Sequence, residues 1–207
     1  MKALIIGATG RLGNALITQL SSEGWEISVL VRSTFRVKQK NKLKAIYKGN
    51  VLDLNSLLEA IRDIDVVFNA IGAKQFWNPL TIFSEGVRNI MDAMQQSGVK
   101  KYVGVGPATI LDDPVEGLRG DKGLPSILKH LFDDNVRLLK IVESYSIPWV
   151  IVCPNFMPNG QLTENYRLQK NLLPENGTKA SVEDVAHALV RLSQDPEYEN
   201  HRVGIAY

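Results

Sequence analysis

A glycine-rich turn near the N-terminus constrains the fold of this chain more than any other feature. Three glycines, spaced three residues apart, follow the apolar run 3–6, and the third lies at the start of an amphipathic stretch at Leu12–Leu20. A strand, a sharp turn and a helix in this order bring the backbone close to a pyrophosphate, and the first N–H groups of the helix favour anions. We therefore predict a dinucleotide-binding turn. Its predicted contact residues are Gly7, Thr9, Gly10, Arg11, Leu12 and Gly13.

Short apolar runs alternate with helical patterns along the rest of the chain. Strands are predicted at 3–6, 27–31, 45–47, 66–70, 102–105, 149–153 and 203–206, and helices at 12–20, 54–61, 81–96, 128–145 and 181–192. This alternation indicates βαβ units with right-handed crossovers. We expect an α/β, doubly wound, mostly parallel sheet, which is a Rossmann fold, in a single domain over residues 1–207.

Local signals mark three helix ends. Asp53 is a predicted N-cap, Ser97-Gly98 is a typical C-terminal stop, and Ser181 with Asp184 has the spacing of a capping box.

Two segments depart from the alternation, at about 107–126 and 154–180. Both follow predicted strands at the carboxyl edge, where open α/β sheets bind ligands. We interpret them as the walls of a substrate cleft. Asp112, Asp113 and Glu116, within the first, are expected to be solvated.

The end of the second strand favours NADP(H) over NAD(H). An acidic residue there would bind a ribose hydroxyl, whereas this chain has Arg32, with Thr34 and Arg36 beyond it. Seven basic residues and no acidic ones lie between Arg32 and Lys48, and we interpret the lysines at 38–48 as a solvated loop. Before the next strand, that stretch contains a single aromatic residue, Phe35, and it has no nucleic-acid recognition motif. We therefore expect no nucleic-acid partner.

Composition is that of an ordinary globular protein, with 44% hydrophobic residues, 22% charged residues and a net charge of +2. The lone Cys153 excludes an intrachain disulfide and is expected in the core, and the three histidines are too scattered for a metal site. No apolar run approaches the length of a membrane span. We expect a cytoplasmic protein with no membrane partner, for which a monomer is plausible.

The glycine spacing, with Ala8 and Thr9 between the first two glycines, resembles that of atypical short-chain dehydrogenase/reductases of the NAD(P)H-binding, NmrA-like group. Within that group the chain is most similar to NADPH-dependent flavin reductases of the biliverdin reductase B type. The resemblance rests on Val31-Arg32 with Thr34 and Arg36, and on the runs 84–90, 133–137, 162–166 and 195–198. It implies hydride transfer from NADPH to a flavin, a linear tetrapyrrole or another flat conjugated acceptor. It also implies further cofactor contacts at Asn50, Val51, Ala70, Ile71, Gly72 and Pro154.

The chain departs from that pattern where the substrate would lie. Pro107 replaces the serine of a short-chain dehydrogenase, and Leu131 and Asn135 replace its tyrosine and lysine, so alcohol–ketone chemistry is not expected. Compared with the flavin reductases, this chain has different residues at positions that are polar or aromatic in that pattern. Its segment after the fifth strand is also longer. Catalytic residues stay unassigned. The cleft residues named by this comparison are Pro107, Thr109, Asn135 and Phe156.

Three functions remain open at this point. The first is an NADPH-dependent reductase with a small-molecule acceptor such as a flavin. The second is a non-catalytic redox sensor of the NmrA-like type, which the missing triad favours. The third, a sugar epimerase or dehydratase, lacks its Tyr/Lys pair and ranks last. Phe76 and Trp77 could stack on a planar ligand or simply plug a loop.

Overall fold

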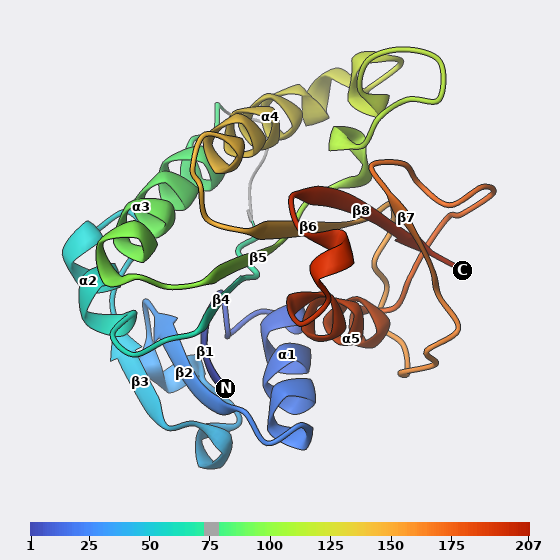
Figure 1. Cartoon of the computed structure of the whole chain (residues 1–207). Coiled ribbons are helices and arrows are strands. Elements are labelled where there is room, and N and C mark those ends of the chain that lie inside the picture. The colour runs from blue at the N-terminus through green and yellow to red at the C-terminus, as the bar shows by residue number, and fades with distance from the viewer. Residues whose placement is uncertain (73–78) are drawn as a thin grey trace.

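The computed structural model describes residues 1–72 and 79–207, and within them one eight-stranded sheet forms the centre of the fold (Figure 1). The strands run in the order β3-β2-β1-β4-β5-β6-β8-β7. They are β1 (Lys2–Ile6), β2 (Glu26–Val31), β3 (Ala45–Lys48), β4 (Val66–Asn69), β5 (Lys101–Val105), β6 (Trp149–Pro154), β7 (Arg167–Lys170) and β8 (His201–Ala206). All neighbours pair in parallel except β7, which is antiparallel to β8. The predicted α/β, doubly wound fold is confirmed.

Helices cover both faces of the sheet. They are α1 (Arg11–Ser22), α2 (Leu54–Ala60), α3 (Ile82–Ser97), α4 (Lys129–Glu143) and α5 (Val182–Ser193). Helices α1 and α5 pack together on one face, while α2, α3 and α4 cover the other (Figure 1). Central strands therefore need apolar side chains on both faces, which explains their unbroken apolar runs.

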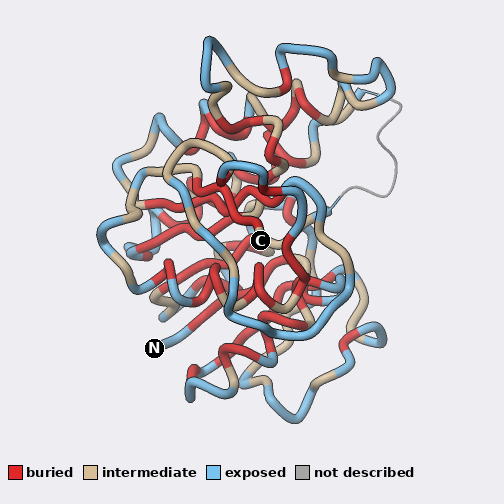
Figure 2. The backbone as a smooth tube through the Cα atoms, turned by 90° about the vertical axis from the view of Figure 1, so that its right-hand side faces the viewer, coloured by how far each residue is buried: buried red, intermediate tan, exposed pale blue. Residues whose placement is uncertain are grey.

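The buried residues form two clusters, one on each side of the sheet. Along β1, Ala3 and Ile5 enter the cluster with α1 and α5, whereas Leu4 and Ile6 enter the cluster with α2, α3 and α4. Figure 2 shows the buried backbone running through the centre, with exposed turns around it. The central strands are thus held by packing on both faces.

The elements expected from sequence lie within two residues of their predicted bounds. Two predicted helix ends are also confirmed: Asp53 accepts a hydrogen bond from the Asn55 N–H, and Gly98 adopts a left-handed conformation with φ of 69°. Of the two hydrogen bonds in the predicted capping box at α5, only one forms. Ser181 accepts from the Asp184 N–H at 3.0 Å, but the Ser181 N–H donates to the Tyr207 hydroxyl instead of to Asp184.

Strand β7 was not predicted, because Arg167–Lys170 contains a single apolar residue, Leu168. It gains its strand conformation from long-range pairing with β8, where Leu168 faces Ile205. Part of the segment 154–180 is therefore regular structure at the edge of the sheet.

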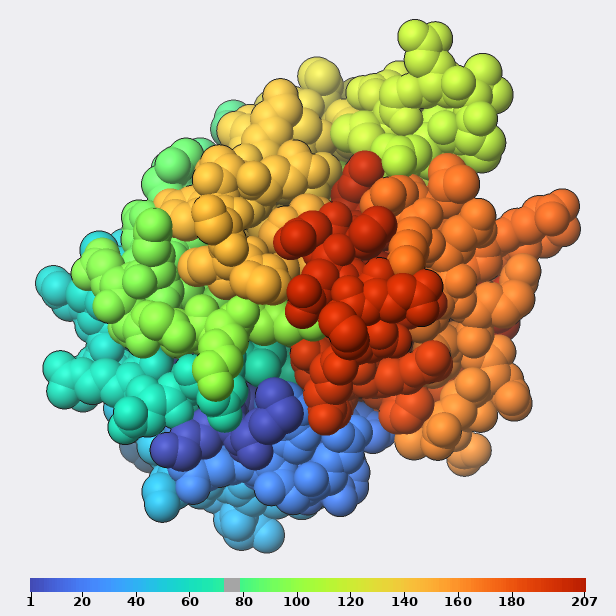
Figure 3. Space-filling model, viewed as in Figure 1, coloured from blue at the N-terminus to red at the C-terminus, as the bar shows by residue number. Residues whose placement is uncertain are grey.

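The segments 107–126 and 154–180 lie against each other, as Figure 3 shows for the yellow-green and orange residues. The Asp112 N–H donates to the Asn171 carbonyl at 2.8 Å, and Arg202 donates to the Asp112 carboxylate at 2.9 Å. Asp112 is thus ion-paired, although its side chain is 42% exposed, and Asp113 pairs with Lys122 at 2.9 Å with 21% of its side chain exposed. The prediction that these two carboxylates are merely solvated is corrected. Ile110 and Leu111 are fully buried, so the first segment covers core as well as lying beside the carboxyl edge.

Candidate nucleotide-binding site

The strand order changes direction beside β1. The chain proceeds from β1 to β2 and β3 on one side, and from β4 to β5 and β6 on the other. The loops that leave β1 and β4 therefore separate at the carboxyl edge, which is where open α/β sheets hold ligands. The glycine turn follows β1, and the run Ala70-Ile71-Gly72 follows β4.

These two loops touch at a position that only glycine can occupy. Gly7 has φ of +89°, and a Cβ built on it would lie 2.5 Å from the Ala70 carbonyl oxygen. A Cβ on Gly13 would lie 2.5 Å from the Ala8 Cα, so α1 packs directly on the turn. The Gly10 N–H closes the turn by donating to the Gly7 carbonyl at 3.0 Å. The glycines thus permit the sharp turn that was predicted from their spacing, and they let the loop after β4 and helix α1 approach that turn closely.

Helix α1 begins with unused hydrogen-bond donors. Its N-cap, Gly10, has no side chain to cap it. Within residues 1–72 and 79–207, the backbone N–H groups of Arg11, Leu12 and Gly13 have no acceptor. Together with the positive end of the helix dipole, these donors suit a phosphate group. Leu12 is 5% exposed, so only its backbone can take part.

The exposed side chains of the turn are Thr9 and Arg11. Arg11 donates to the Asn159 carboxamide oxygen at 2.8 Å, which connects the turn with the loop after β6. Asn159 was not singled out from sequence, and no local motif marks it.

The end of β2 carries arginine side chains that contact no partner among the described residues. Arg32 and Arg36 are exposed, and in the described part of the chain neither side chain makes an ion pair or hydrogen bond. Thr34, between them, is half-buried in a short 3-10 turn at Thr34–Arg36. Because guanidinium groups bind phosphate through paired N–H donors, this end of the sheet can accept a 2′-phosphate.

The loops after β3 and β4 are held by amide side chains. The Asn50 oxygen accepts from the Leu52 N–H at 3.3 Å, and Asn89 donates to the Val51 carbonyl at 3.1 Å. After β4, Asn69 donates to the Tyr102 hydroxyl at 2.9 Å and accepts from the Ile71 N–H at 3.2 Å. This buried pair positions the loop that meets Gly7, and burial raises the pKa of Tyr102 above its ordinary value. The position of Asn69 at a strand end could have signalled this role.

None of the residues predicted to line the cleft for the hydride acceptor is an acid or a base. Pro107 and Thr109 are half-buried in a 3-10 turn after β5, and Phe156, after β6, is 63% exposed. Pro154 is buried at the end of β6. Asn135 is only 2% exposed and donates to the Leu131 carbonyl of its own helix at 2.8 Å, so its burial does not favour a cleft-lining role.

Several of the runs that carried the family resemblance build internal polar contacts. Asp134 on α4 is fully buried and accepts from the Phe83 N–H and the Ser84 hydroxyl on α3. Asp184 on α5 accepts from the Thr163 N–H and hydroxyl, the Glu164 N–H and the Tyr207 hydroxyl. These carboxylates stabilise the packing of distant segments.

Cys153 is a core residue, as expected. It is fully buried, and this burial raises the pKa of its thiol to about 12. Such a thiol is a poor nucleophile. Phe76 and Trp77, proposed as stacking or plugging residues, lie outside the described residues.

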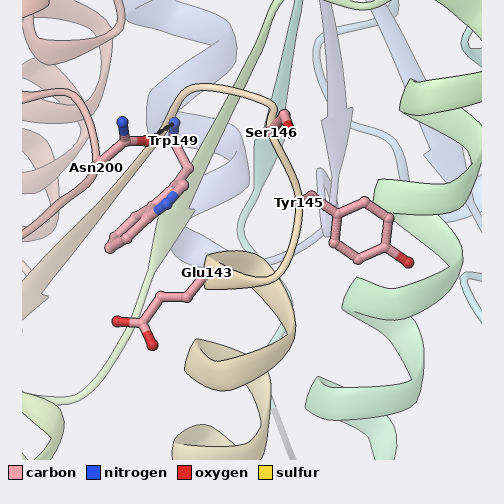
Figure 4. A pocket seen from close by; sticks show the side chains of 5 residues that line it. All are labelled: Glu143, Tyr145, Ser146, Trp149 and Asn200. Atoms are coloured by element: carbon pink, nitrogen blue, oxygen red, sulfur yellow. Dashed lines mark hydrogen bonds between the residues drawn. The ribbon is translucent and has the colours of Figure 1, made fainter.

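A surface depression of about 330 Å³ lies at the opposite, amino edge of the sheet (Figure 4). It is lined by Glu143, Tyr145, Ser146, Trp149 and Asn200. The Trp149 N–H donates to Asn200, while Tyr145 turns toward α3 and bonds Asp92 there. This depression offers neither a helix N-terminus nor a glycine turn, the two features of the carboxyl edge that suit a dinucleotide.

The fold and the edge of the sheet define a Rossmann-type dinucleotide-binding protein. Residues 7–196 match the NAD(P)H-binding family, and the chain belongs to that family. The coarser resemblance inferred from sequence is thereby confirmed, whereas the comparisons give no direct support for the narrower likeness to biliverdin reductase B.

The individual relatives have several different names. The chain is 29% identical to an isoflavone reductase homolog from Nicotiana tabacum, covering 96% of this chain and 66% of that protein, so it spans just under two thirds of that relative. It is 26% identical to the uncharacterized protein YwnB from Bacillus subtilis, covering 98% and 96% of the two chains. A structure from Streptococcus pneumoniae, provisionally named an NADH-flavin reductase, has a TM-score of 0.85 at 21% identity, covering 100% and 99%. That likeness shows the fold.

The described residues contain neither a candidate membrane span nor a candidate metal site. None of their helices has the length and apolarity needed to cross a membrane. Among the same residues, no group of three or more histidine, cysteine, aspartate or glutamate side chains could hold a metal ion.

Proposed function

We propose that this chain is an NADPH-dependent reductase that delivers hydride to a flavin or another flat conjugated acceptor. The observation that carries the proposal is the carboxyl edge beside β1 and β4, where Gly7 meets the Ala70 carbonyl and the first N–H groups of α1 have no acceptor among residues 1–72 and 79–207. The family supplies the cofactor class. The reductase names of the Nicotiana relative and the Streptococcus structure support the reaction class.

Each part of that edge takes a separate role in binding. The N–H groups at the start of α1 bind the pyrophosphate, and Arg32 with Arg36 binds the 2′-phosphate. The backbone of Ala70 to Gly72 and of Pro154 borders the nicotinamide ribose. When bound, NADPH supplies a hydride and leaves as NADP⁺.

The acceptor side orients the acceptor and donates no proton. Phe156 presents an exposed aromatic face after β6, on which a conjugated ring can stack. Pro107 and Thr109 carry no group that titrates near neutral pH, and Asn135 is buried with its amide bound to the Leu131 carbonyl. A flavin reduced by hydride takes its remaining proton from water, so the chain accelerates transfer by holding the two rings together.

NADPH oxidation in the presence of FMN, FAD or biliverdin, followed at 340 nm, tests this activity. We expect turnover with at least one acceptor, and a lower rate for Phe156→Ala than for Phe156→Tyr. A folded protein that turns over none of the acceptors contradicts the proposal.

A second candidate is a non-catalytic redox sensor, which the absence of an acid at Pro107 and Asn135 favours. It requires NADPH binding without turnover. It also requires a protein partner that is retained on the immobilised chain with NADPH but not with NADP⁺. Flavin reduction at a rate above that of free NADPH with flavin excludes a purely sensory role.

A further inference from the structure

The loop between β2 and β3 concentrates positive charge on one part of the surface. Seven basic residues and no acidic ones lie between Arg32 and Lys48. The whole chain has 24 basic and 22 acidic residues, so with these seven set aside the acidic residues outnumber the basic ones by five. Because β3 is the strand at one edge of the sheet (Figure 1), the positive charge lies at one side of the molecule. Such an asymmetry turns this side toward an anionic surface.

The fold holds this loop against α1 and leaves its lysines in solvent. Val37 is 4% exposed in the core beside α1, and Gln39 donates to a carbonyl of that helix at 2.8 Å. Lys38, between these two anchors, is exposed, as are Lys40 and Lys42 in the 3-10 turn that follows. The loop is therefore fixed while its charged groups stay accessible.

The charge of the loop is hardly compensated within the protein. Among the described residues, its one ion pair joins Lys44 to Glu26, whose charged atoms are 3.9 Å apart. Five of the seven basic residues are lysines, which act as flexible point charges, whereas recognition of a single phosphate favours the rigid fork of arginine. The lysines thus suit a surface that carries many loosely ordered anionic groups.

Phe35 adds an apolar group to this cationic loop. It is 94% exposed, more than any other large hydrophobic residue of the described chain. It lies two residues before the buried Val37, so its exposure does not come from a detached loop. Aromatic side chains are favoured at the boundary between lipid headgroups and hydrocarbon, and lysines beside them meet anionic headgroups there.

We propose that the loop from Phe35 to Lys44 binds the surface of an anionic lipid bilayer, with its lysines on the headgroups and Phe35 inserted at the interface. The sequence predicted no membrane partner because no apolar run is long enough to span a bilayer, and a surface contact needs no such run. Duplex nucleic acid is another polyanion, but the loop has one aromatic residue and no recognition motif. The contact requires no cofactor, so it is independent of the proposed reductase activity.

Flotation with lipid vesicles tests the proposal. The wild-type protein should float with equimolar phosphatidylcholine and phosphatidylserine but not with phosphatidylcholine alone, and added salt should release it. Lys38→Gln combined with Lys42→Gln should lower partitioning onto the anionic vesicles at least about tenfold. Lys140→Gln combined with Lys179→Gln removes the same charge from exposed positions in other segments, and it should change partitioning less than about twofold.

Substitutions at Phe35 separate insertion from charge. Phe35→Ala should lower partitioning about fivefold, as expected for partial burial of an aromatic side chain. Val115→Ala removes another apolar side chain, 86% exposed in a different segment, and should leave partitioning unchanged. Phe35→Trp should retain partitioning, and its added indole emission, measured as the difference from wild type, should shift to shorter wavelength on the anionic vesicles.

Three results would overturn the proposal. The first is wild-type protein that does not float with the anionic vesicles. The second is retention by duplex DNA without binding to those vesicles, which would identify a nucleic-acid partner instead. The third is unchanged partitioning of the variant that lacks Lys38 and Lys42.

Discussion

The two halves of the carboxyl edge differ in whether their polar groups have partners within the protein. Around β1, β2 and β4, the first N–H groups of α1 and the side chains of Arg32 and Arg36 have no partner within the described residues. Around β5, β6 and β8, Asp134, Asp184 and Arg202 each bind several groups from other elements. The first half keeps donors available for an anionic ligand, whereas the second uses its polar groups to hold irregular segments in place.

This difference follows from how each half is built. In the first half, the tight turn from β1 to α1 leaves the first backbone donors of that helix without partners in the described residues. The second half carries the segments 107–126 and 154–180, whose backbone polar groups need partners that no helix or ladder supplies. Substitutions should therefore change stability in the second half and cofactor affinity in the first.

The largest effect is expected for Asp184→Ala. It removes the acceptor for the Thr163 and Glu164 N–H groups and for the Tyr207 hydroxyl, so unfolding free energy should fall by about 3 kcal/mol. The NADPH Kd of the folded protein should change less than about threefold. Glu183→Ala, one residue earlier in the same turn, is the control. Urea unfolding measures both, and equal stabilities for the two variants would contradict the assignment.

Asp184 also predicts how stability depends on pH. Burial alone would raise the pKa of Asp184, but the hydrogen bonds from Tyr207 and Thr163 outweigh it and hold that pKa below its usual value. The contribution is therefore present above the ordinary aspartate pKa, about 3.9, and is lost as pH falls through the lower folded value. Wild-type unfolding free energy should decline more steeply than that of Asp184→Ala below about pH 4. Parallel curves would exclude this carboxylate as the source.

In the first half, Gly7→Ala should affect both stability and binding. The added Cβ would meet the Ala70 carbonyl at 2.5 Å in a backbone conformation with φ of +89°. We expect a loss of about 2 kcal/mol and a rise of more than about tenfold in the NADPH Kd. Gly24→Ala is the matched control, because Gly24 also has a positive φ, 74°, but has nothing within 4 Å. It should cost stability only, and equal NADPH affinities for the two variants would show that the contact between the two loops does not matter for binding.

The sequence predicted the first half better than the second for a physical reason. A glycine turn between a strand and a helix is a local pattern, and its backbone demands can be recognised within about ten residues. The contacts of the second half join distant positions: Thr163 and Asp184 are 21 residues apart, and Asp112 and Arg202 are 90 apart. Local spacing at Ser181 and Asp184 indicated a capping box, and only the folded chain shows Asp184 facing Thr163 and Tyr207.

Strand β7 illustrates the same limit. Its four residues hold one apolar side chain, and their conformation depends on β8, which comes more than thirty residues later in the chain. The cofactor and cleft residues named from sequence stay predictions. The fold brings the glycine turn, Ala70 and Asn50 to one edge, whereas Asn135 is buried within its own helix packing.

Arg32→Glu should weaken NADPH binding at least about tenfold, or about 1.4 kcal/mol, because it replaces a phosphate donor with a like charge. NADH, which lacks the 2′-phosphate, should lose much less. Lys40→Glu, the same charge change in the neighbouring basic loop, serves as the control. Fluorescence titration of the wild type and both variants with each cofactor measures the six dissociation constants. Equal losses for NADPH and NADH would mean that Arg32 does not select the phosphate.

The smallest effect is expected at Asn135, which the sequence comparison named as a cleft residue but which is buried within its own helix packing. Its amide donates to the Leu131 carbonyl at 2.8 Å and it is 2% exposed, so it has no free group for proton transfer. If water supplies the proton, Asn135→Leu should leave kcat for flavin reduction within about threefold and its pH profile unchanged, since direct acid catalysis contributes at least about a hundredfold. Thermal unfolding identifies a variant that fails only through misfolding. A loss of kcat of a hundredfold or more in a folded Asn135→Leu protein would place a catalytic group in the half that we describe as structural, and the division between the two halves would then fail.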